Sequence, residues 1–296
     1  MSYSSQVKTE ITSRESITNL EKLAELYGIF QSKDAIGRYE INLRVENSFL
    51  AKRVYSLLKE VTTLKIGIKY SICNKLGEHN VFSIEVFRQK GIKEFLSSLQ
   101  FRYIDIVSHE EILKGYIKGM FLACGYMKDP KKEYAMDFFI DKKEIAEDFY
   151  RILLHNKKKV FITKKRNKTL VYLRNSEDIM DMLVLMGAMK QFFSYEETTM
   201  MKDLKNKTIR EMNWEVANET KTLNTGNYQI KMIEYIEENM GLNNLTPVLL
   251  EAVQIRLEHP ESSLQELADF IGISKSGIRN RFRRIEGIYE KLKEEA

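Results

Sequence analysis

The C-terminal fold is decided by residues 263–285, which read SLQELADFIGISKSGIRNRFRRI. Ser263 is a typical helix N-cap, and Glu266 three residues later completes a capping box. Gly272 offers the left-handed backbone conformation in which helices commonly end, and Ser274 is placed to cap the next helix. The stretch therefore predicts two helices joined by a tight turn, which is a helix-turn-helix.

Each of the two predicted helices has one apolar face. In the first helix this face consists of Leu264, Leu267, Ala268 and Ile271. In the second helix it consists of Ile278, Phe282, Ile285 and Tyr289. We expect both faces to pack into one small core, together with a supporting helix at 247–259 that ends at Pro260.

The opposite face of the second helix carries side chains that bind DNA bases and phosphates. The predicted DNA-binding residues are Ser274, Lys275, Ser276, Arg279, Asn280, Arg283 and Arg284. Residues 226–296 contain nine Lys and Arg and twelve Asp and Glu, so this segment is not basic overall. Any DNA contact must therefore be local to this helix. The alternative is an ordinary helix pair with a solubilising basic face.

Upstream of residue 200 the hydrophobic periodicity alternates between helix and strand. Helices are predicted at 17–31, 49–61, 92–99, 110–124, 142–154 and 177–186, and strands at 39–45, 64–72, 81–87, 134–140, 160–163 and 170–173. Gly28 and Gly119 lie 91 positions apart, and the later elements keep nearly the same offset. This order predicts an internal duplication of an α/β unit, whose two copies pair about a pseudo-twofold axis.

A second basic segment, residues 157–168, carries seven basic residues and no acid. Its final part lies in a predicted turn between two strands. We predict DNA-phosphate contacts for Lys164, Lys165, Arg166 and Lys168, because such clusters neutralise phosphates and release counterions. A solvated surface hairpin is the alternative.

Residues 200–226 are polar, rich in Asn and Thr, and weakly periodic, which indicates a linker or an arm that orders on a partner. The predicted domains are therefore 1–199 and 227–296, joined by this linker.

Composition excludes several classes of protein. The chain has 296 residues, of which 43% are hydrophobic and 30% charged, and a formal net charge of +5. No apolar run approaches the roughly 18–20 residues of a membrane span, and the N-terminus lacks the apolar core of a signal peptide. Cys73 and Cys124 form no paired motif, which fits a reducing compartment. We expect a cytoplasmic, nucleoid-associated protein without membrane contact.

Several segments resemble the bacterial WhiA family, most strongly after residue 110. They are Val7–Ile11, Gly115–Pro130, Arg256–Glu261, Ser263–Ala268 and Ile273–Ile285. In 200–226 the family's Asn-rich signature is matched by Lys205, Asn206, Arg210, Asn213, Glu215, Ala217, Asn218 and Lys221. Ile209, Trp214 and Val216 depart from that signature.

The resemblance implies an α+β N-terminal domain of duplicated LAGLIDADG-like αββαββα-type units and an all-α helix-turn-helix domain. It also implies a transcription regulator of double-stranded DNA, linked to sporulation, cell division or chromosome segregation. Partners among transcription or division proteins follow from the resemblance alone, and the oligomeric state stays open.

The motif helices of LAGLIDADG enzymes each deliver one acid, the eighth motif residue, to a shared metal site. Here the matching segments are 26–34 and 117–125, with Gly28 and Gly119 as motif glycines, and the acid positions hold Lys33 and Cys124. A charged lysine cannot coordinate Mg²⁺, and a thiol is too soft. A one-residue slip would offer only one acid, from Asp34 or Asp129. We therefore predict no catalytic residue, metal or cofactor.

Three alternatives remain open at this level. An active endonuclease would need two converging acids and would cut plasmid DNA in the presence of Mg²⁺. An RNA-binding protein would use the strands around 157–168, although Phe161 and Tyr172 are few stacking aromatics for that purpose. A protein-interaction module would use the α/β surface without touching DNA.

Overall fold

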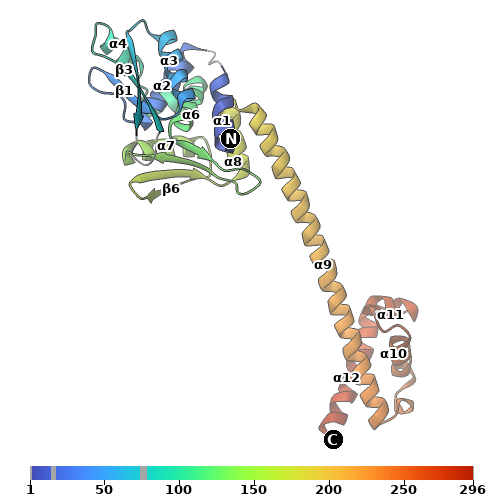
Figure 1. The fold of residues 1–296 in the computed structure, drawn as a ribbon. Coiled ribbons are helices and arrows are strands. Elements are labelled where there is room, and N and C mark those ends of the chain that lie inside the picture. The colour runs from blue at the N-terminus through green and yellow to red at the C-terminus, as the bar shows by residue number, and fades with distance from the viewer. Residues whose placement is uncertain (1, 15–17, 74–78, 296) are drawn as a thin grey trace. The chain divides into compact units, whose positions relative to one another are not determined.

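The computed structural model describes residues 2–14, 18–73 and 79–295, which form two compact units (Figure 1). Unit 1 is Met1–Lys202 and unit 2 is Asp203–Ala296. None of the helices in the described ranges combines the length and apolar character needed to cross a bilayer.

Unit 1 is built from two copies of one motif. After α1 (Tyr3–Ser13), the first copy contains α2 (Asn19–Ser32), β1 (Ile41–Val45), α3 (Ser48–Val61), β2 (Ile66–Cys73), β3 (His79–Val86) and α4 (Ile92–Ser98). After α5 (Tyr103–Ser108), the second contains α6 (Glu110–Cys124), β4 (Gly125–Met127), β5 (Met136–Ile140), α7 (Lys143–His155), β6 (Val160–Lys165), β7 (Lys168–Leu173) and α8 (Ser176–Leu185).

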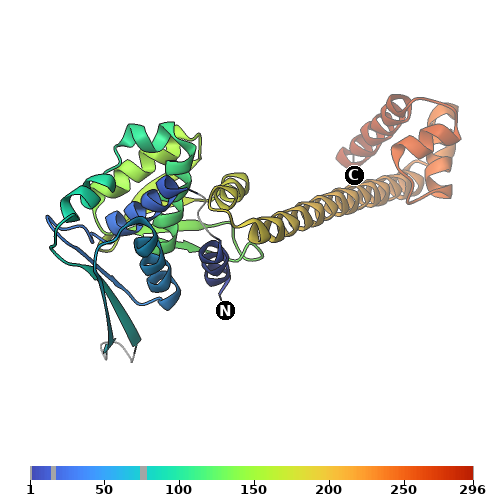
Figure 2. The ribbon, with the colours of Figure 1, turned by 90° about the horizontal axis from the view of Figure 1, so that it is seen from above.

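The sheets confirm the predicted duplication. Both are antiparallel, with strand orders β1-β3-β2 and β4-β5-β7-β6, so the last three strands of the second sheet repeat the order of the first. The second copy has the full αββαββα order, whereas in the first copy an isolated bridge between Ile36 and Ile41 stands where β4 would lie. Figure 2 shows β2 and β3 extending together as a long hairpin.

Several details differ from the sequence prediction. The elements α1, α5 and β4 were not predicted: α5 and β4 are too short to establish a period, and α1 buries only Ser4, Val7 and Ile11, which is too weak an apolar pattern. The basic turn is also shorter than expected, since Lys164 and Lys165 belong to β6 and Lys168 begins β7. Only Arg166, with φ of 56°, and Asn167 form the turn.

The core of unit 1 forms around the α2–α6 pair, whose backbones touch. A Cβ atom on Gly119 would lie 2.2 Å from the carbonyl oxygen of Glu25, and one on Gly115 would lie 2.3 Å from that of Glu21. A Cβ atom on Gly28 would lie 2.5 Å from the Tyr116 oxygen. Only glycine fits these three positions, which explains the glycines at the matching places of the two motifs.

Buried charges link a third helix to this pair. The fully buried Glu25 of α2 accepts two hydrogen bonds from Arg53 of α3, at 2.9 and 3.0 Å. Lys118 of α6 lies 2.6 Å from Glu21 and 3.8 Å from Glu25. Because each buried charge faces an opposite one, the network orients α2, α3 and α6 against one another.

Unit 2 contains most of α9 (Met189–Asn239), followed by η1 (Leu242–Asn244), α10 (Pro247–Glu258), α11 (Leu264–Phe270) and α12 (Lys275–Glu294). The predicted capping box is confirmed, since the Ser263 side chain accepts from the Glu266 amide and Glu266 accepts from the Ser263 amide. Gly272 has φ of 68°. The core that holds these helices includes Ile233, Ile236, Leu249, Val253, Leu267, Ala268, Ile278, Phe282 and Ile285.

The expected linker at 200–226 is helical throughout and lies inside α9. It contains no proline, and its one glycine is Gly226 at the end. Its side chains from 203 to 221 are exposed. A helix without a buried face needs no regular spacing of apolar residues, and that spacing is the signal by which helices were predicted. The functional domain limits at 199 and 227 stay a prediction.

We expect Gly119→Ala to destabilise unit 1 by about 3 kcal/mol or more, because the new methyl group would collide with backbone atoms that cannot move independently. Gly287→Ala in α12 is the control. A Cβ atom there has nothing within 4 Å, so a gain of about 0.5–1 kcal/mol is expected. Denaturant unfolding with hydrogen exchange, which locates the change in α6 or α12, measures both. Equal stability of Gly119→Ala and wild type would contradict the close contact.

Candidate nucleic-acid interface

The second helix of the helix-turn-helix, α12, is anchored on one side and free on the other. Ile278, Phe282 and Ile285 are buried in the core of unit 2. The Ser274 hydroxyl accepts a hydrogen bond from the Gly277 amide at 3.1 Å and so starts the helix. All seven residues predicted to bind DNA are exposed: Ser274, Lys275, Ser276, Arg279, Asn280, Arg283 and Arg284.

Arg281 is the basic residue of this segment that does not belong to the exposed face. It is half-buried, and its guanidinium lies 2.5 Å from the Glu251 carboxylate of α10. The exposed face therefore combines guanidinium, ammonium, amide and hydroxyl groups. All of these can donate hydrogen bonds to base edges or phosphate oxygens.

The loop before α11 is organised by Arg256, a role that the sequence analysis did not assign. Arg256 is 1% exposed, and one guanidinium nitrogen donates to the carbonyls of His259, Pro260 and Ser262, at 3.3, 3.2 and 2.7 Å. Burial lowers the pKa of Arg256 to about 10. Its Nε has no hydrogen-bond partner among the described residues.

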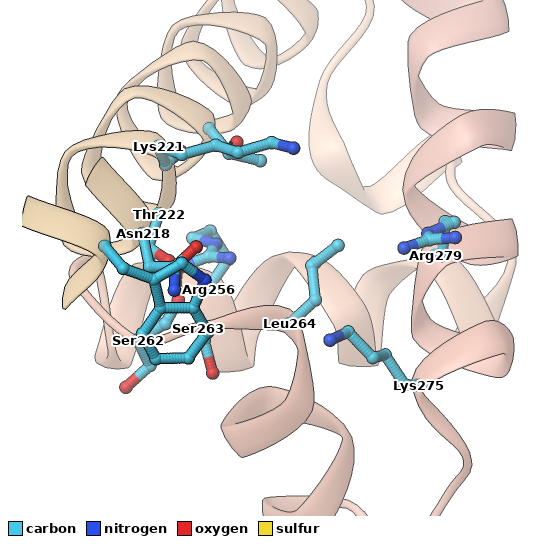
Figure 3. Close-up of a pocket in the computed structure, with 11 residues that line it drawn as sticks. Asn218, Lys221, Thr222, Arg256, Ser262, Ser263, Leu264, Lys275 and Arg279 are labelled. Atoms are coloured by element: carbon cyan, nitrogen blue, oxygen red, sulfur yellow. Dashed lines mark hydrogen bonds between the residues drawn. The ribbon is translucent and has the colours of Figure 1, made fainter. Parts of the chain in front are cut away.

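An open cavity of about 450 Å³ lies in unit 2 beside this loop (Figure 3). Four cationic residues line it, namely Lys221 of α9, Arg256 of α10, and Lys275 and Arg279 of α12. None of the described side chains that line the cavity is a carboxylate. Figure 3 shows Lys221 extending from α9 toward the side of α12 that carries Arg279.

The two degenerate motif positions lie at the ends of α2 and α6. Lys33 follows the last residue of α2, and Cys124 is the last residue of α6. Cys124 is 7% exposed, and its thiol donates to the Met120 carbonyl oxygen at 3.1 Å. Burial raises the pKa of the thiol to about 12, although Lys33 and Lys8 act in the opposite direction. A protonated, buried thiol is a poor ligand for Mg²⁺.

Lys8 of α1 also reaches this region, which the sequence analysis missed because α1 was not predicted. Its ammonium donates to the Leu122 carbonyl oxygen at 3.1 Å, near the end of α6. Burial lowers the pKa of Lys8 to about 8. A cavity of about 310 Å³ is lined here by the basic residues Lys8, Lys33 and Arg44 and by one acid, Glu46. Three basic side chains and one carboxylate thus gather near the end of α6.

Asp34 and Asp129, the acids next to the motif segments in the sequence, have other partners. Asp34 lies 2.6 Å from the Lys142 ammonium, and Asp129 accepts from the Lys131 amide at 2.9 Å. Within residues 2–14, 18–73 and 79–295, no group of three or more His, Cys, Asp or Glu residues is placed to hold a metal ion. The residues present do not fit the magnesium site that the fold implies.

The basic hairpin, defined as Lys164, Lys165, Arg166 and Lys168, is exposed. Lys165 lies over the Phe139 ring at 5.5 Å, and Lys168 is 3.0 Å from Asp141. Strand alternation and the pairing of Lys165 with Lys168 put these two lysines on the sheet face that carries Phe139. Lys164 belongs to the opposite face, so the four predicted residues do not form one flat surface.

Comparison with known proteins gives consistent matches. The description "WhiA LAGLIDADG-like domain" matches residues 113–205, and "WhiA C-terminal HTH domain" matches residues 209–289. The "Probable cell division protein WhiA" of Pediococcus pentosaceus is 33% identical over 315 residues, covering 99% of this chain and 100% of that protein. The protein of the same name from Clostridium botulinum is 29% identical, covering 99% of both. The crystal structure of full-length WhiA from Thermotoga maritima has a TM-score of 0.63 at 22% identity, covering 98% of this chain and 99% of that one.

The lowered pKa of Lys8 predicts a pH dependence of stability. The pKa is about 8 in the folded chain against 10.5 for a free lysine, so the unfolded chain binds more protons between these values. Wild-type stability therefore gains up to about 3 kcal/mol, from this group alone, as the pH rises from 8 to 10.5.

We expect Lys8→Met to lack this gain, so the two stability curves should converge or cross as the pH rises. Denaturant unfolding at a series of pH values measures the difference. Lys52→Met, at an exposed position of α3, is the control and should follow the wild-type curve. Parallel curves for wild type and Lys8→Met would show that Lys8 is not desolvated.

Proposed function

The chain belongs to the WhiA family, and from this premise we propose that it is a sequence-specific DNA-binding protein that regulates transcription. The observation that supports this function is the exposed N-terminal half of α12. Its guanidinium and amide groups project from a helix whose other side is fixed in a core. Such an arrangement suits insertion of a helix into the major groove of double-stranded DNA.

The roles of the individual side chains follow from their chemistry and spacing. Ser276, Arg279, Asn280 and Arg283 are separated by three or four residues, so they share a face of α12. Arginine binds guanine with two hydrogen bonds and asparagine binds adenine in the same way, so Arg279, Asn280 and Arg283 would read bases. Ser274, Lys275 and Arg284 would hold phosphates and fix the position of the helix on the duplex.

The biological process is proposed from the relatives. Curated relatives carry the name "Probable cell division protein WhiA". We assign this chain to the control of genes for cell division, with sporulation and chromosome segregation as the other processes that the family implies. The site of action would be the nucleoid in the cytoplasm.

We further propose that the LAGLIDADG-like unit does not cut DNA. The motif positions that should supply acids hold Lys33 and Cys124, and Lys8 adds a third polar group unable to bind Mg²⁺ while protonated. Hydrolysis of a phosphodiester by bound metal ions requires carboxylates that converge on the scissile phosphate. If this is correct, plasmid DNA incubated with the protein and Mg²⁺ stays intact.

The unit instead offers an auxiliary surface for DNA. The basic hairpin is exposed, and two of its lysines lie on one sheet face beside the stacked rings of Phe161 and Tyr172, whose centroids are 5.4 Å apart. Lysines at the edge of a sheet can contact phosphates without reading sequence.

Arg279→Ala should weaken binding to a selected DNA site by roughly 1–3 kcal/mol, if Arg279 makes two hydrogen bonds to a base. Binding to random DNA should change much less. Arg281→Ala is the matched control, because Arg281 belongs to the same helix but pairs with Glu251. Fluorescence anisotropy with labelled duplexes measures both. An equal loss on selected and random DNA would assign Arg279 to a phosphate.

Replacing all four hairpin residues by Gln should flatten the dependence of log affinity on log salt by up to roughly 3–4 units. Sequence preference should stay as in wild type, because phosphate contacts carry no sequence information. A control variant replaces four exposed helical lysines, Lys52, Lys59, Lys93 and Lys143. If both variants keep the wild-type slope, the hairpin does not touch DNA.

A further inference from the structure

The exposed part of α9 in unit 2 has two faces of different chemistry. Its polar stripe is Lys207, Arg210, Trp214, Asn218, Lys221 and Thr225, spaced by three or four residues and therefore aligned along one side of the helix. Ile209, Met212, Val216 and Leu223 lie on another side and are all exposed. The polar stripe contains three basic residues, and its N-terminal end is bordered by Asp203 and Glu211, four residues before and after Lys207.

The C-terminal half of this stripe lines the cavity beside α12. Trp214, Asn218, Lys221 and Thr225 of α9 share the cavity with Lys275 and Arg279 of α12. Two helices far apart in the sequence, α9 and α12, therefore direct basic side chains into the same cavity (Figure 3).

The placement of α9 relative to the helix-turn-helix is set inside unit 2. A Cβ atom on Gly226 would lie 2.5 Å from the Pro260 carbonyl oxygen, so α9 touches the backbone of the loop that Arg256 organises. The buried Ile233 and Ile236, two and three turns further along α9, belong to the same core as α12. The helix that carries the polar stripe and α12 thus share one hydrophobic core.

In the described part of the chain, no carboxylate lines this cavity. Lys221, Lys275, Arg279 and the buried Arg256 all line it, and the hydrogen bonds of Arg256 go to backbone carbonyls. Cationic groups that are brought together without carboxylates favour an anion between them. The indole N–H of Trp214, the amide of Asn218 and the hydroxyl of Thr225 add neutral donors suited to phosphate oxygens.

We propose that the polar stripe of α9 is a second DNA-contacting element, and that the cavity between it and α12 receives the phosphodiester backbone beside the groove that α12 reads. The inference rests on the proposed DNA-binding function and deepens it. In this arrangement α12 reads base edges, while α9 holds phosphates and supplies affinity on any sequence.

Trp214 makes the proposal measurable, because it is the single tryptophan of the chain and is 69% exposed. In the full-length protein, its emission should change when a duplex chosen by the protein from a random pool is added. A random duplex should give the same change at higher concentration. Inorganic phosphate or a mononucleotide at millimolar concentration should give none.

Variants of α9 test the contact itself. Lys221→Gln should lower the slope of log affinity against log salt by about 1 unit, and the triple variant Lys207→Gln, Arg210→Gln, Lys221→Gln by up to about 3 units. Affinity should fall by the same factor on chosen and random duplexes. Lys205→Gln is the control, because Lys205 is exposed on the same helix but outside the stripe.

Three results would overturn the proposal, and they can be told apart. Tight binding of a labelled duplex without a change in Trp214 emission, and with the wild-type slope in the triple variant, would reject α9 while leaving DNA reading by α12 intact. An equal emission change with inorganic phosphate or a mononucleotide would assign the cavity to a small anion. Failure of the wild-type chain to bind any duplex would reject the proposed function together with this inference.

Discussion

The contact between the backbones of α2 and α6 is the constraint on which the rest of unit 1 depends. Gly28, Gly115 and Gly119 let the two helices approach until a Cβ atom at any of them would collide with a carbonyl oxygen. Because each helix carries its own sheet and outer helices, this approach sets the distance between the two copies. It also brings the ends of both helices together, with Lys33 after α2 and Cys124 at the end of α6. The packing therefore still produces the convergence that two acids would need, although a lysine and a buried thiol stand at the places where acids would bind Mg²⁺.

Unit 2 uses a similar close contact for another purpose. Gly226 allows α9 to touch the loop after α10, and Arg256 holds the carbonyls of that loop from inside. A buried guanidinium that gives its hydrogen bonds to carbonyls keeps its positive charge, at a pKa that burial lowers to about 10. The loop is thereby rigid, and it adds positive charge to the cavity that α12 shares with α9. Arg256 thus both fixes the loop after α10 and contributes positive charge to the cavity.

The parts of this architecture that local signals determine could be predicted from the sequence. Ser263, Glu266, Gly272 and Ser274 act within one or two turns, and the structure confirms the capping and the left-handed glycine. Likewise the duplicated order of elements follows from hydrophobic periods. Three features depend on distant contacts and were missed: Lys8 at the end of α6, the Gly226–Pro260 approach, and Arg256 inside its loop. The helix at 200–226 was missed for the opposite reason, because its side chains from 203 to 221 are exposed and no apolar period marks it.

Unit 2 has no excess of basic residues. What favours DNA binding is how its basic and acidic residues are distributed over the faces of α9 and α12. Residues 203–225 contain four basic and four acidic residues, and residues 226–296 contain nine basic and twelve acidic ones. Neither segment would attract DNA through its net charge. Glu211, Glu215 and Glu219 follow one another at intervals of four along α9, so that Glu211, four residues after Lys207 and three before Trp214, borders the polar stripe and Glu219 lies away from it. At physiological salt the potential of an exposed charge decays over about 8 Å, so a phosphate in the cavity at the C-terminal end of the stripe experiences mainly Lys221, Lys275 and Arg279, which line that cavity. Glu219, on the side of α9 away from the stripe, would repel a duplex that approached from there, and the same helix would therefore favour one orientation of unit 2 on DNA.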